Sequence, residues 1–292
     1  MLTLCAPAKV NLYLRVLARE TRGYHQLETV FAALEFGDTL TMSRTEGGVT
    51  LTSRGLAVGP EKENLVYRAA VAFLEGGGVA GGVEIHLEKR IPLGGGLGGG
   101  SSDAAAALRG LQALFPGALA PEEVLEVAGS LGSDVPFFLC GSPLALAWGR
   151  GHRLLPLPPL PSSPVLLALP PLAVPTAEAY RLVAEAREKG DRPCPPRILS
   201  ARALSTWDGL ASLAANDFED VVLPAHPPLA RLREAMEETN PRLALLSGSG
   251  ACLFAVYAGE KDALRGRAHM EKRFPETGFV LTRTLDQAGW GA

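Results

Sequence analysis

The chain has 292 residues, a net charge of −3 and an apolar share of 47%. This length favours two domains, and a proline-rich stretch near residue 158 divides the chain into residues 1–158 and 159–292. Mild acidity without a block of like charge argues against a nucleic-acid partner. A basic leader and a long apolar run are both missing, so no membrane association and a cytoplasmic location are expected.

The first part of the chain predicts a β-rich opening. Apolar and polar residues alternate over residues 9–16, which predicts a strand that directs Lys9 and Asn11 to its polar, water-facing side. Shorter strand patterns continue to residue 52, and a helical period over residues 63–75 ends at three glycines.

Two further patterns flank the most distinctive stretch of the sequence. Residues 83–88 alternate as a strand with one wet face, which favours an antiparallel sheet. Pro121 opens a helix that ends at Gly132, and Asp134 follows just beyond it.

The stretch from Pro92 to Leu108 contains six glycines and then an alanine-rich run. Such a glycine density suits backbone with positive φ or close approach to a ligand, and the run after it favours a helix beginning near Ser102. Ser101, Ser102 and Asp103 supply N-cap chemistry. The unpaired N–H groups of a helix start bind phosphate well, so the stretch predicts an oligophosphate cradle.

Three other interpretations of the cradle fit less well. A P-loop requires a lysine after the glycines, and none follows. The spacing Gly94-x-Gly96-x-x-Gly99 matches a dinucleotide fingerprint, but the preceding strand is half-wet and is broken by Pro92. A flexible linker would have polar surroundings, whereas a strand and a helix directly flank these glycines.

Phosphoryl transfer needs charge neutralisation and an oriented acceptor hydroxyl. Lys9 and Asp134 are the candidates, the lysine for negative charge and the aspartate as acceptor of the hydroxyl proton. The alternatives are a solvated lysine on a wet strand face and an aspartate that only caps a helix.

Aromatic residues raise the possibility of a nucleobase site. Tyr24 and His25 in a polar turn, with Tyr180 as an opposing ring, suit stacking and hydrogen bonding to a base. The alternative is that the first two are surface residues and that Tyr180 packs in the core.

The second half has an α+β pattern. Ser247-Gly-Ser-Gly250 lies between two strand patterns and is either a plain hairpin or a turn that approaches a ligand. The helical patterns cover residues 176–188, 197–213, 226–239 and 260–273, and the strand patterns cover 165–169, 243–246, 251–257 and 278–283.

These motifs together resemble those of the GHMP kinases. The cradle resembles the second motif of that family in the form found where the acceptor is a CDP-linked methylerythritol. Four further segments carry the resemblance to about residue 257. They are Ala6-Pro-Ala-Lys-Val-Asn, Gly23-Tyr-His-Gln-Leu-Glu, Gly132-Ser-Asp-Val-Pro-Phe-Phe and Asn216-Asp-Phe-Glu, together with the Ser247-Gly-Ser-Gly turn. The sequence departs from the pattern at Ser133, where alanine is common, and at Ala251-Cys252, where proline-threonine is frequent.

The resemblance implies an α+β fold of two GHMP kinase domains with the active site in the cleft between them. ATP would be the phosphoryl donor, and the 2-hydroxyl of the CDP-linked methylerythritol the acceptor, on the non-mevalonate route to isoprenoid precursors. Mg2+ would be held mainly by phosphates and water, without an assigned protein ligand.

The resemblance also assigns residues. Lys9 and Asp134 would be the catalytic pair, Asn11 would contact the polyol, and Tyr24, His25 and Tyr180 would hold the cytosine. The residues for ATP would be Asn64, near the adenine, and Pro92, Leu93, Gly94, Gly95, Gly96, Leu97, Gly98, Gly99, Gly100, Ser101 and Ser102.

Two alternatives of different kinds stay open. Another small-molecule kinase of the family, acting on homoserine or mevalonate, would not recognise CTP or CDP. A nucleic-acid-binding module of similar α+β architecture would bind RNA in a salt-dependent way without kinase activity.

Overall fold

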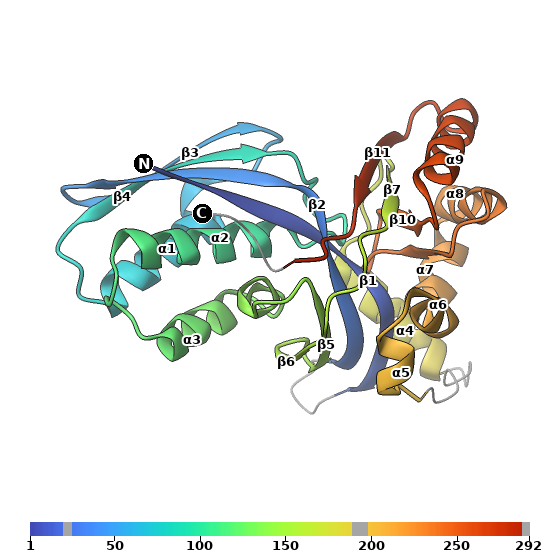
Figure 1. Cartoon of the computed structure of the whole chain (residues 1–292), viewed down its shortest axis with the longest axis horizontal. Helices are drawn as coiled ribbons and strands as arrows, with labels where there is room; N and C mark the ends of the chain where they lie inside the picture. The colour runs from blue at the N-terminus through green and yellow to red at the C-terminus, as the bar shows by residue number, and fades with distance from the viewer. Residues whose placement is uncertain (20–24, 189–197, 288–292) are drawn as a thin grey trace.

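The computed structural model describes residues 1–19, 25–188 and 198–287. Two β-sheets, each covered by helices, lie side by side, and two long strands run from one part of the molecule into the other (Figure 1). The predicted α+β class is confirmed. The domain boundary at residue 158 stays a prediction.

The larger sheet has seven strands in the described part of the chain. They are β1 (Leu2–Arg19), β2 (His25–Thr45), β3 (Gly48–Gly55), β4 (Gly82–Lys89), β5 (Leu144–Gly149), β6 (Arg153–Pro156) and β8 (Ala215–Asn216). The order is β3-β4-β2-β1-β8, with β5 paired to β2 and β6 to β5.

Strand β4 was predicted to be a half-exposed strand in an antiparallel sheet, and the structure agrees with this prediction in part. It pairs antiparallel with β2, and its apolar residues are buried. It pairs parallel with β3, however, because the connection between them contains the helix α1 (Leu65–Gly76), and a helical crossover returns the chain in the same direction.

Three helices cover one face of the larger sheet, namely α1, α2 (Gly99–Leu114) and α3 (Pro121–Leu131) (Figure 1). The alanine run Ala104–Ala107 of α2 is fully buried, which allows a close approach to the strands. A Cβ at Gly110 would lie 2.4 Å from Met42 Sδ, so a side chain there would require Met42 to move. Short 3-10 helices occupy Glu61–Glu63 (η1) and Val135–Leu139 (η2).

The smaller sheet is antiparallel in the order β11-β7-β10-β9. Its strands are β7 (Pro164–Leu169), β9 (Leu243–Leu246), β10 (Leu253–Val256) and β11 (Gly278–Arg283). The helices around it are α4 (Thr176–Glu188), α5 (Ala201–Leu204), α6 (Trp207–Leu213), α7 (Glu219–Ala225), α8 (Pro227–Glu238) and α9 (Glu260–Arg273).

Two helical predictions in this half differ from the structure. The pattern over residues 197–213 forms two short helices, because the Thr206 side chain accepts from Gly209 N and begins a new helix there. Helix α7 was missed because Pro224 lies inside it and interrupts the helical pattern.

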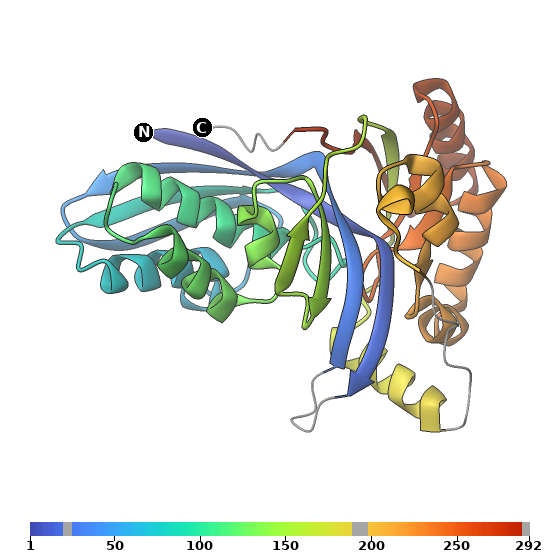
Figure 2. The ribbon, with the colours of Figure 1, turned by 60° about the horizontal axis from the view of Figure 1, so that its bottom comes forward.

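Strand β1 is buried on both faces, contrary to the prediction of a wet polar side. Lys9, Asn11, Tyr13 and Arg15 are all buried. The reason is that β1 and β2 pass between the helices of the larger sheet and the elements of the second half, so each strand face is covered (Figure 2). The interpretation of Lys9 as a solvated surface lysine is therefore wrong.

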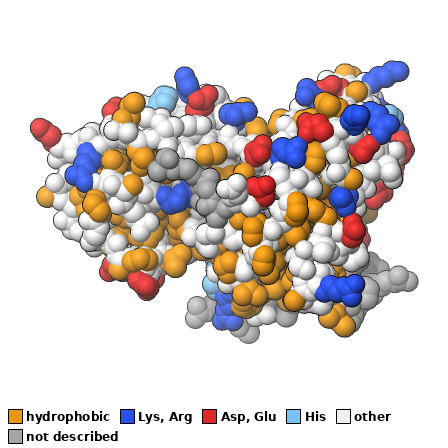
Figure 3. All heavy atoms as spheres, viewed as in Figure 1, with side chains coloured by type: hydrophobic (Ala, Val, Ile, Leu, Met, Phe, Trp, Pro, Cys, Tyr) orange, Lys and Arg blue, Asp and Glu red, His pale blue; other side chains and the backbone are white. Residues whose placement is uncertain are grey.

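The surface offers one further observation. On the face shown in Figure 3, lysine and arginine side chains are interspersed with aspartate and glutamate, and no broad patch of one sign covers that face. Across the described ranges, no helix is both long enough and apolar enough to cross a membrane.

Candidate active site

A pocket of about 250 Å³ lies where β1, β2, the cradle and α4 meet. Of the residues that the sequence singles out, it brings together Lys9, Asn11, Asp134 and Tyr180 with two glycines of the cradle, Gly96 and Gly98. Its lining includes Lys9, Asn11, Thr29, Gly96, Gly98, Ser133, Asp134, Arg150, Thr176, Tyr180, Phe218 and Gly248.

Lys9 and Asp134 form an ion pair in this pocket. Lys9 Nζ lies 3.5 Å from Asp134 Oδ2, with the lysine buried and the aspartate side chain 32% exposed. Burial lowers the pKa of Lys9, and the Asp134 carboxylate partly opposes that effect. Asp134 occupies the N-cap position of η2 but its side chain makes no capping hydrogen bond, so the carboxylate is available to the pocket.

A chain of hydrogen bonds fixes the lysine. Lys9 Nζ donates to Asn11 Oδ1 at 2.8 Å, and Asn11 Nδ2 donates to Thr29 Oγ1 at 2.8 Å. Thr29 in turn donates to Tyr13 O at 2.6 Å. Thr29 was missed in the sequence, because only the pairing of β2 with β1 brings it to Asn11. The Lys9 ammonium also lies 5.2 Å from the centre of the Phe31 ring.

The glycine-rich loop lies directly against Lys9. Gly94, Gly96 and Gly98 have positive φ, and Lys9 N donates to Leu97 O at 2.9 Å. A Cβ at Gly98 would lie 2.9 Å from Lys9 Cγ, so a side chain there would displace the lysine. The loop therefore forms one wall of the same pocket.

The start of α2 differs from the prediction. The helix begins at Gly99 after the N-cap Gly98, not near Ser102, and no side chain caps it. Ser102 and Asp103 lie inside the helix, and Asp103 accepts a hydrogen bond from Lys89. Because glycine at a left-handed φ can end the loop sharply, the helix starts earlier and its first N–H groups lack a side-chain cap.

The turn after β9 supports the loop from behind. Ser247 Oγ donates to Gly96 O at 3.0 Å, and Cys252 N donates to Gly95 O at 3.2 Å. Asn216 Nδ2 donates to Leu246 O and Gly248 O, both at 2.8 Å. This turn joins two antiparallel strands, so it is a hairpin, and it also contacts the cradle. Its approach to a ligand stays a prediction.

Two of the three residues predicted to hold a nucleobase, His25 and Tyr180, lie against each other in the structure. His25 and Tyr180 stack with ring centres 4.8 Å apart and an interplanar angle of 16°. Phe218 contacts the Tyr180 ring edge to face at 5.0 Å. Tyr24 lies outside the described residues.

Asn64 lies away from this pocket. Its side chain accepts from Val66 N at 2.9 Å and so caps α1. The next residue, Leu65, lies beside the start of α2, because a Cβ at Gly100 would be 3.7 Å from Leu65 Cδ1. Asn64 is thus near the beginning of the cradle helix.

Arg150 is a further residue of the pocket, and the motifs in the sequence do not single it out. It lies in the turn between β5 and β6, between Gly149 and Gly151, both with positive φ, and it lines the pocket. A Cβ at Gly151 would lie 3.8 Å from Asp134 Oδ1, so this turn lies close to the carboxylate. The Gly-Arg-Gly triplet was the available signal.

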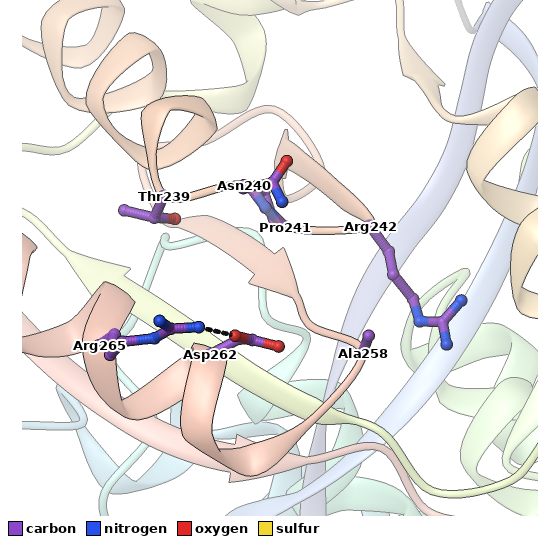
Figure 4. A pocket seen from close by; sticks show the side chains of 7 residues that line it. All are labelled: Thr239, Asn240, Pro241, Arg242, Ala258, Asp262 and Arg265. Carbon is purple, nitrogen blue, oxygen red and sulfur yellow. Dashed lines mark hydrogen bonds and ion pairs between the residues drawn. The ribbon is translucent and has the colours of Figure 1, made fainter.

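A second hollow, of about 470 Å³, lies on the second half beside α9 (Figure 4). Its two arginines have carboxylate partners: Arg242 pairs with Asp208 at 2.8 Å, and Arg265 pairs with Asp262. None of the candidate residues lines it. Within the described ranges, no group of three or more His, Cys, Asp or Glu residues could hold a metal ion.

A glycine loop at an uncapped helix start, beside a buried lysine and a carboxylate, is an arrangement suited to phosphoryl transfer. Two family models match the chain, GHMP kinases N terminal domain over residues 64–142 and GHMP kinases C terminal over residues 200–276. The chain belongs to the GHMP kinase family, and the resemblance seen in the sequence is confirmed.

Individual relatives agree with this membership. The 4-diphosphocytidyl-2-C-methyl-D-erythritol kinase of Moorella thermoacetica is 39% identical over 98% of this chain and 99% of the relative. That of Pelotomaculum thermopropionicum is also 39% identical, with the same coverage. A crystal structure of 4-(cytidine 5'-diphospho)-2C-methyl-D-erythritol kinase matches with a TM-score of 0.82 and 37% identity over 97% of this chain and 99% of that one. A homoserine kinase structure from Cytophaga hutchinsonii, 20% identical with a TM-score of 0.71, shares the fold.

Proposed function

We propose that this protein transfers the γ-phosphoryl group of ATP to the 2-hydroxyl of 4-diphosphocytidyl-2-C-methyl-D-erythritol, on the non-mevalonate route to isoprenoid precursors. One observation carries the proposal: a single pocket joins the Lys9–Asp134 pair and the glycine-rich loop to Tyr180, on which His25 stacks. The full-length relatives at 39% identity support the same acceptor.

ATP is the co-substrate of this kinase family, and residues 92–102 are proposed to hold its triphosphate. The uncapped N–H groups at the start of α2 point positive charge at the phosphates, and the glycines allow close approach. Asn64, at the start of α1 beside this helix, is proposed to lie near the adenine.

Lys9 and Asp134 are proposed to carry the chemistry. The Asp134 carboxylate accepts the proton of the acceptor hydroxyl as the oxygen attacks phosphorus. The Lys9 ammonium, oriented by Asn11, offsets the negative charge on the transferred group. Asn11 also faces the pocket and can accept or donate a hydrogen bond to the polyol.

The covalent structure of the acceptor predicts where its diphosphate lies in the pocket. Its diphosphate lies between the cytidine and the polyol, so it must cross the region between the His25–Tyr180 rings and Asp134. Arg150 lines this pocket and carries a guanidinium that can bind phosphate oxygens in pairs, which makes it the proposed diphosphate contact. A base held between the two rings needs roughly 7 Å between them, so binding would part His25 from Tyr180.

Mg2+ is proposed to accompany ATP. The described residues assemble no cluster of three or more protein ligands, so phosphate oxygens and water would supply most of the coordination. When bound, the ion neutralises charge on the phosphates.

A coupled assay of ADP formation tests the function. The enzyme should turn over with 4-diphosphocytidyl-2-C-methyl-D-erythritol, and CDP should compete with that acceptor. Turnover with homoserine or mevalonate instead, without competition by CDP, would assign the chain to another kinase of the family.

A further inference from the structure

Beneath the glycine-rich loop, the protein buries one ammonium between two carboxylates. Lys89, the last residue of β4, lies between Asp38 of β2 and Asp103 of α2, and all three are buried. Lys89 Nζ donates to Asp103 Oδ2 at 2.6 Å and also donates to Asp38 Oδ2. Removing three ionisable groups from water is costly, and the hydrogen bonds between them offset part of that cost.

The cluster connects both ends of the glycine-rich loop. On the incoming side, Asp38 Oδ1 accepts from Arg90 N at 2.5 Å and Ile91 N at 2.8 Å, immediately before Pro92. On the outgoing side, Asp103 lies on α2, the helix that begins where the loop ends. The residues between carry few side chains that could hold the loop themselves.

Lys89 lies directly under the first residue of that helix. A Cβ at Gly99 would be 2.9 Å from Lys89 Nζ, so only glycine fits over the ammonium. The net charge of the cluster therefore acts on the same helix start that faces the triphosphate.

The two carboxylates are not equivalent. Asp38 accepts three hydrogen bonds, whereas Asp103 Oδ1 is buried without a partner. Burial raises the pKa of Asp103 to about 8, and the nearby Asp38 adds to the rise while Lys89 opposes it. The protonated form of Asp103 is therefore more favoured than that of an ordinary aspartate.

Other elements packed on α2 face it with apolar groups. Phe73 of α1, Val124 of α3 and Leu4 of β1 belong to the same buried cluster as the alanines of α2. The charged groups that act on Asp103 in the described part of the chain are accordingly Lys89 and Asp38.

We propose that Lys89, Asp38 and Asp103 are positioning residues for ATP: through the hydrogen bonds of Asp38 to the backbone before Pro92 and of Lys89 to Asp103 on α2, the cluster holds both ends of the glycine-rich loop. Deprotonation of Asp103 adds a negative charge behind the triphosphate site and weakens ATP binding. The proposal rests on the proposed function in that the loop binds ATP. It does not depend on the identity of the acceptor.

Asp103→Asn is the decisive variant, because the amide mimics the neutral carboxyl at nearly constant shape. Calorimetric binding of a non-hydrolysable ATP analogue is measured from about pH 7 to about pH 9.5, without acceptor. For the unmodified enzyme we expect the Kd to rise about fivefold to tenfold as the pH passes the Asp103 pKa near 8. The Asp103→Asn variant should bind like the unmodified enzyme near pH 7 and should show no such rise.

Lys89→Met tests the ammonium. It leaves two buried carboxylates without their cation, so the KM for ATP should rise by about tenfold or more while the KM for the acceptor changes less than about threefold. Glu84→Gln, on the exposed side of the same strand, is the matched control and should change neither. If Lys89→Met does not fold, as thermal unfolding would show, the Asp103→Asn result decides alone.

An alkaline rise that persists in Asp103→Asn, or a Kd of the unmodified enzyme that stays constant over this range, would overturn the proposal. Complete absence of ATP binding at every pH would instead count against the proposed function. The two failures are therefore distinguishable.

Discussion

Lys9 Nζ lies 3.5 Å from Asp134 Oδ2, although one residue belongs to β1 and the other precedes η2. The lysine is buried by the strand pairing and by the glycine-rich loop, and the aspartate reaches it from the end of the segment after α3. This pair places an ammonium and a carboxylate beside the glycine-rich loop that is proposed to hold the triphosphate.

Removal of either member of the pair should abolish most turnover. For Lys9→Ala and for Asp134→Ala we expect kcat to fall by about 10²-fold to 10⁴-fold, because positioned charge and proton transfer act mainly in the transition state. Binding of an ATP analogue should persist within a few-fold. Asp208→Asn, which changes an exposed carboxylate outside the pocket, is the control and should leave kcat unchanged. Near-normal kcat in both alanine variants would refute the catalytic assignment.

The activity should decline on the alkaline side at a pH below the ordinary pKa of lysine. Burial lowers the pKa of Lys9, so its ammonium is lost as the pH rises through a value below that of an ordinary lysine. A profile of kcat against pH at saturating ATP measures this limb. Lys9→Arg keeps its charge over the whole range, so its residual activity should lack the limb, and an unchanged limb would assign it to another group.

Arg150→Ala should weaken binding of the acceptor more than binding of ATP. Loss of a charged contact to a diphosphate should raise the KM for the acceptor by about tenfold to a hundredfold, with kcat and the KM for ATP changed less than about threefold. The preference for CDP over cytidine as competitor should shrink in the same variant. Arg153→Ala, on the exposed strand β6, is the matched control. An undiminished preference for CDP would exclude Arg150 from the diphosphate site.

The aromatic ring of Tyr180 should contribute more to acceptor binding than its hydroxyl does. Tyr180→Phe keeps the stack on His25 and the edge contact with Phe218, so the KM for the acceptor should stay within about threefold. Tyr180→Ala removes a stacking surface worth about 1 to 3 kcal/mol, which corresponds to a rise of about fivefold to 150-fold. Competition by cytidine measures the effect at the base alone, and equal inhibition of both variants would contradict a stacking role.

Two glycines of the loop should respond differently to alanine. Gly98→Ala combines a positive φ with a Cβ 2.9 Å from Lys9 Cγ, so we expect kcat to fall by at least about tenfold. Gly94→Ala meets a positive φ but no neighbouring atom within 4 Å, so it should change the loop only through backbone strain of about 1 kcal/mol. Steady-state kinetics of the two variants separate displacement of Lys9 from backbone strain. Equal losses of kcat would contradict the contact between residue 98 and Lys9.

Several features could be predicted because they depend on neighbouring residues. The alternation at residues 9–16, the helix from Pro121 to Leu131 and the strand over residues 243–246 are local patterns, and the structure contains all three. The start of α2 was misplaced because serine and aspartate favour N-caps locally, whereas the positive φ of Gly98 ends the loop first.

Other features depend on pairing between distant segments. Thr29 and Arg150 enter the pocket through strand register, and Asp38 reaches Lys89 and Asp103 because β2, β4 and α2 converge beneath the loop. A sequence pattern records no such convergence.

The sequence by itself determined the family and the two glycine-rich turns, and it singled out Lys9 and Asp134 as the catalytic candidates. Each of these features lies in a contiguous motif. Only the tertiary structure decided that both faces of β1 are buried, that Lys9 therefore has a lowered pKa, and that the buried Lys89 ammonium lies between Asp38 and Asp103. Burial and charge coupling arise when segments far apart in the chain pack together, and local periodicity does not specify which segments meet.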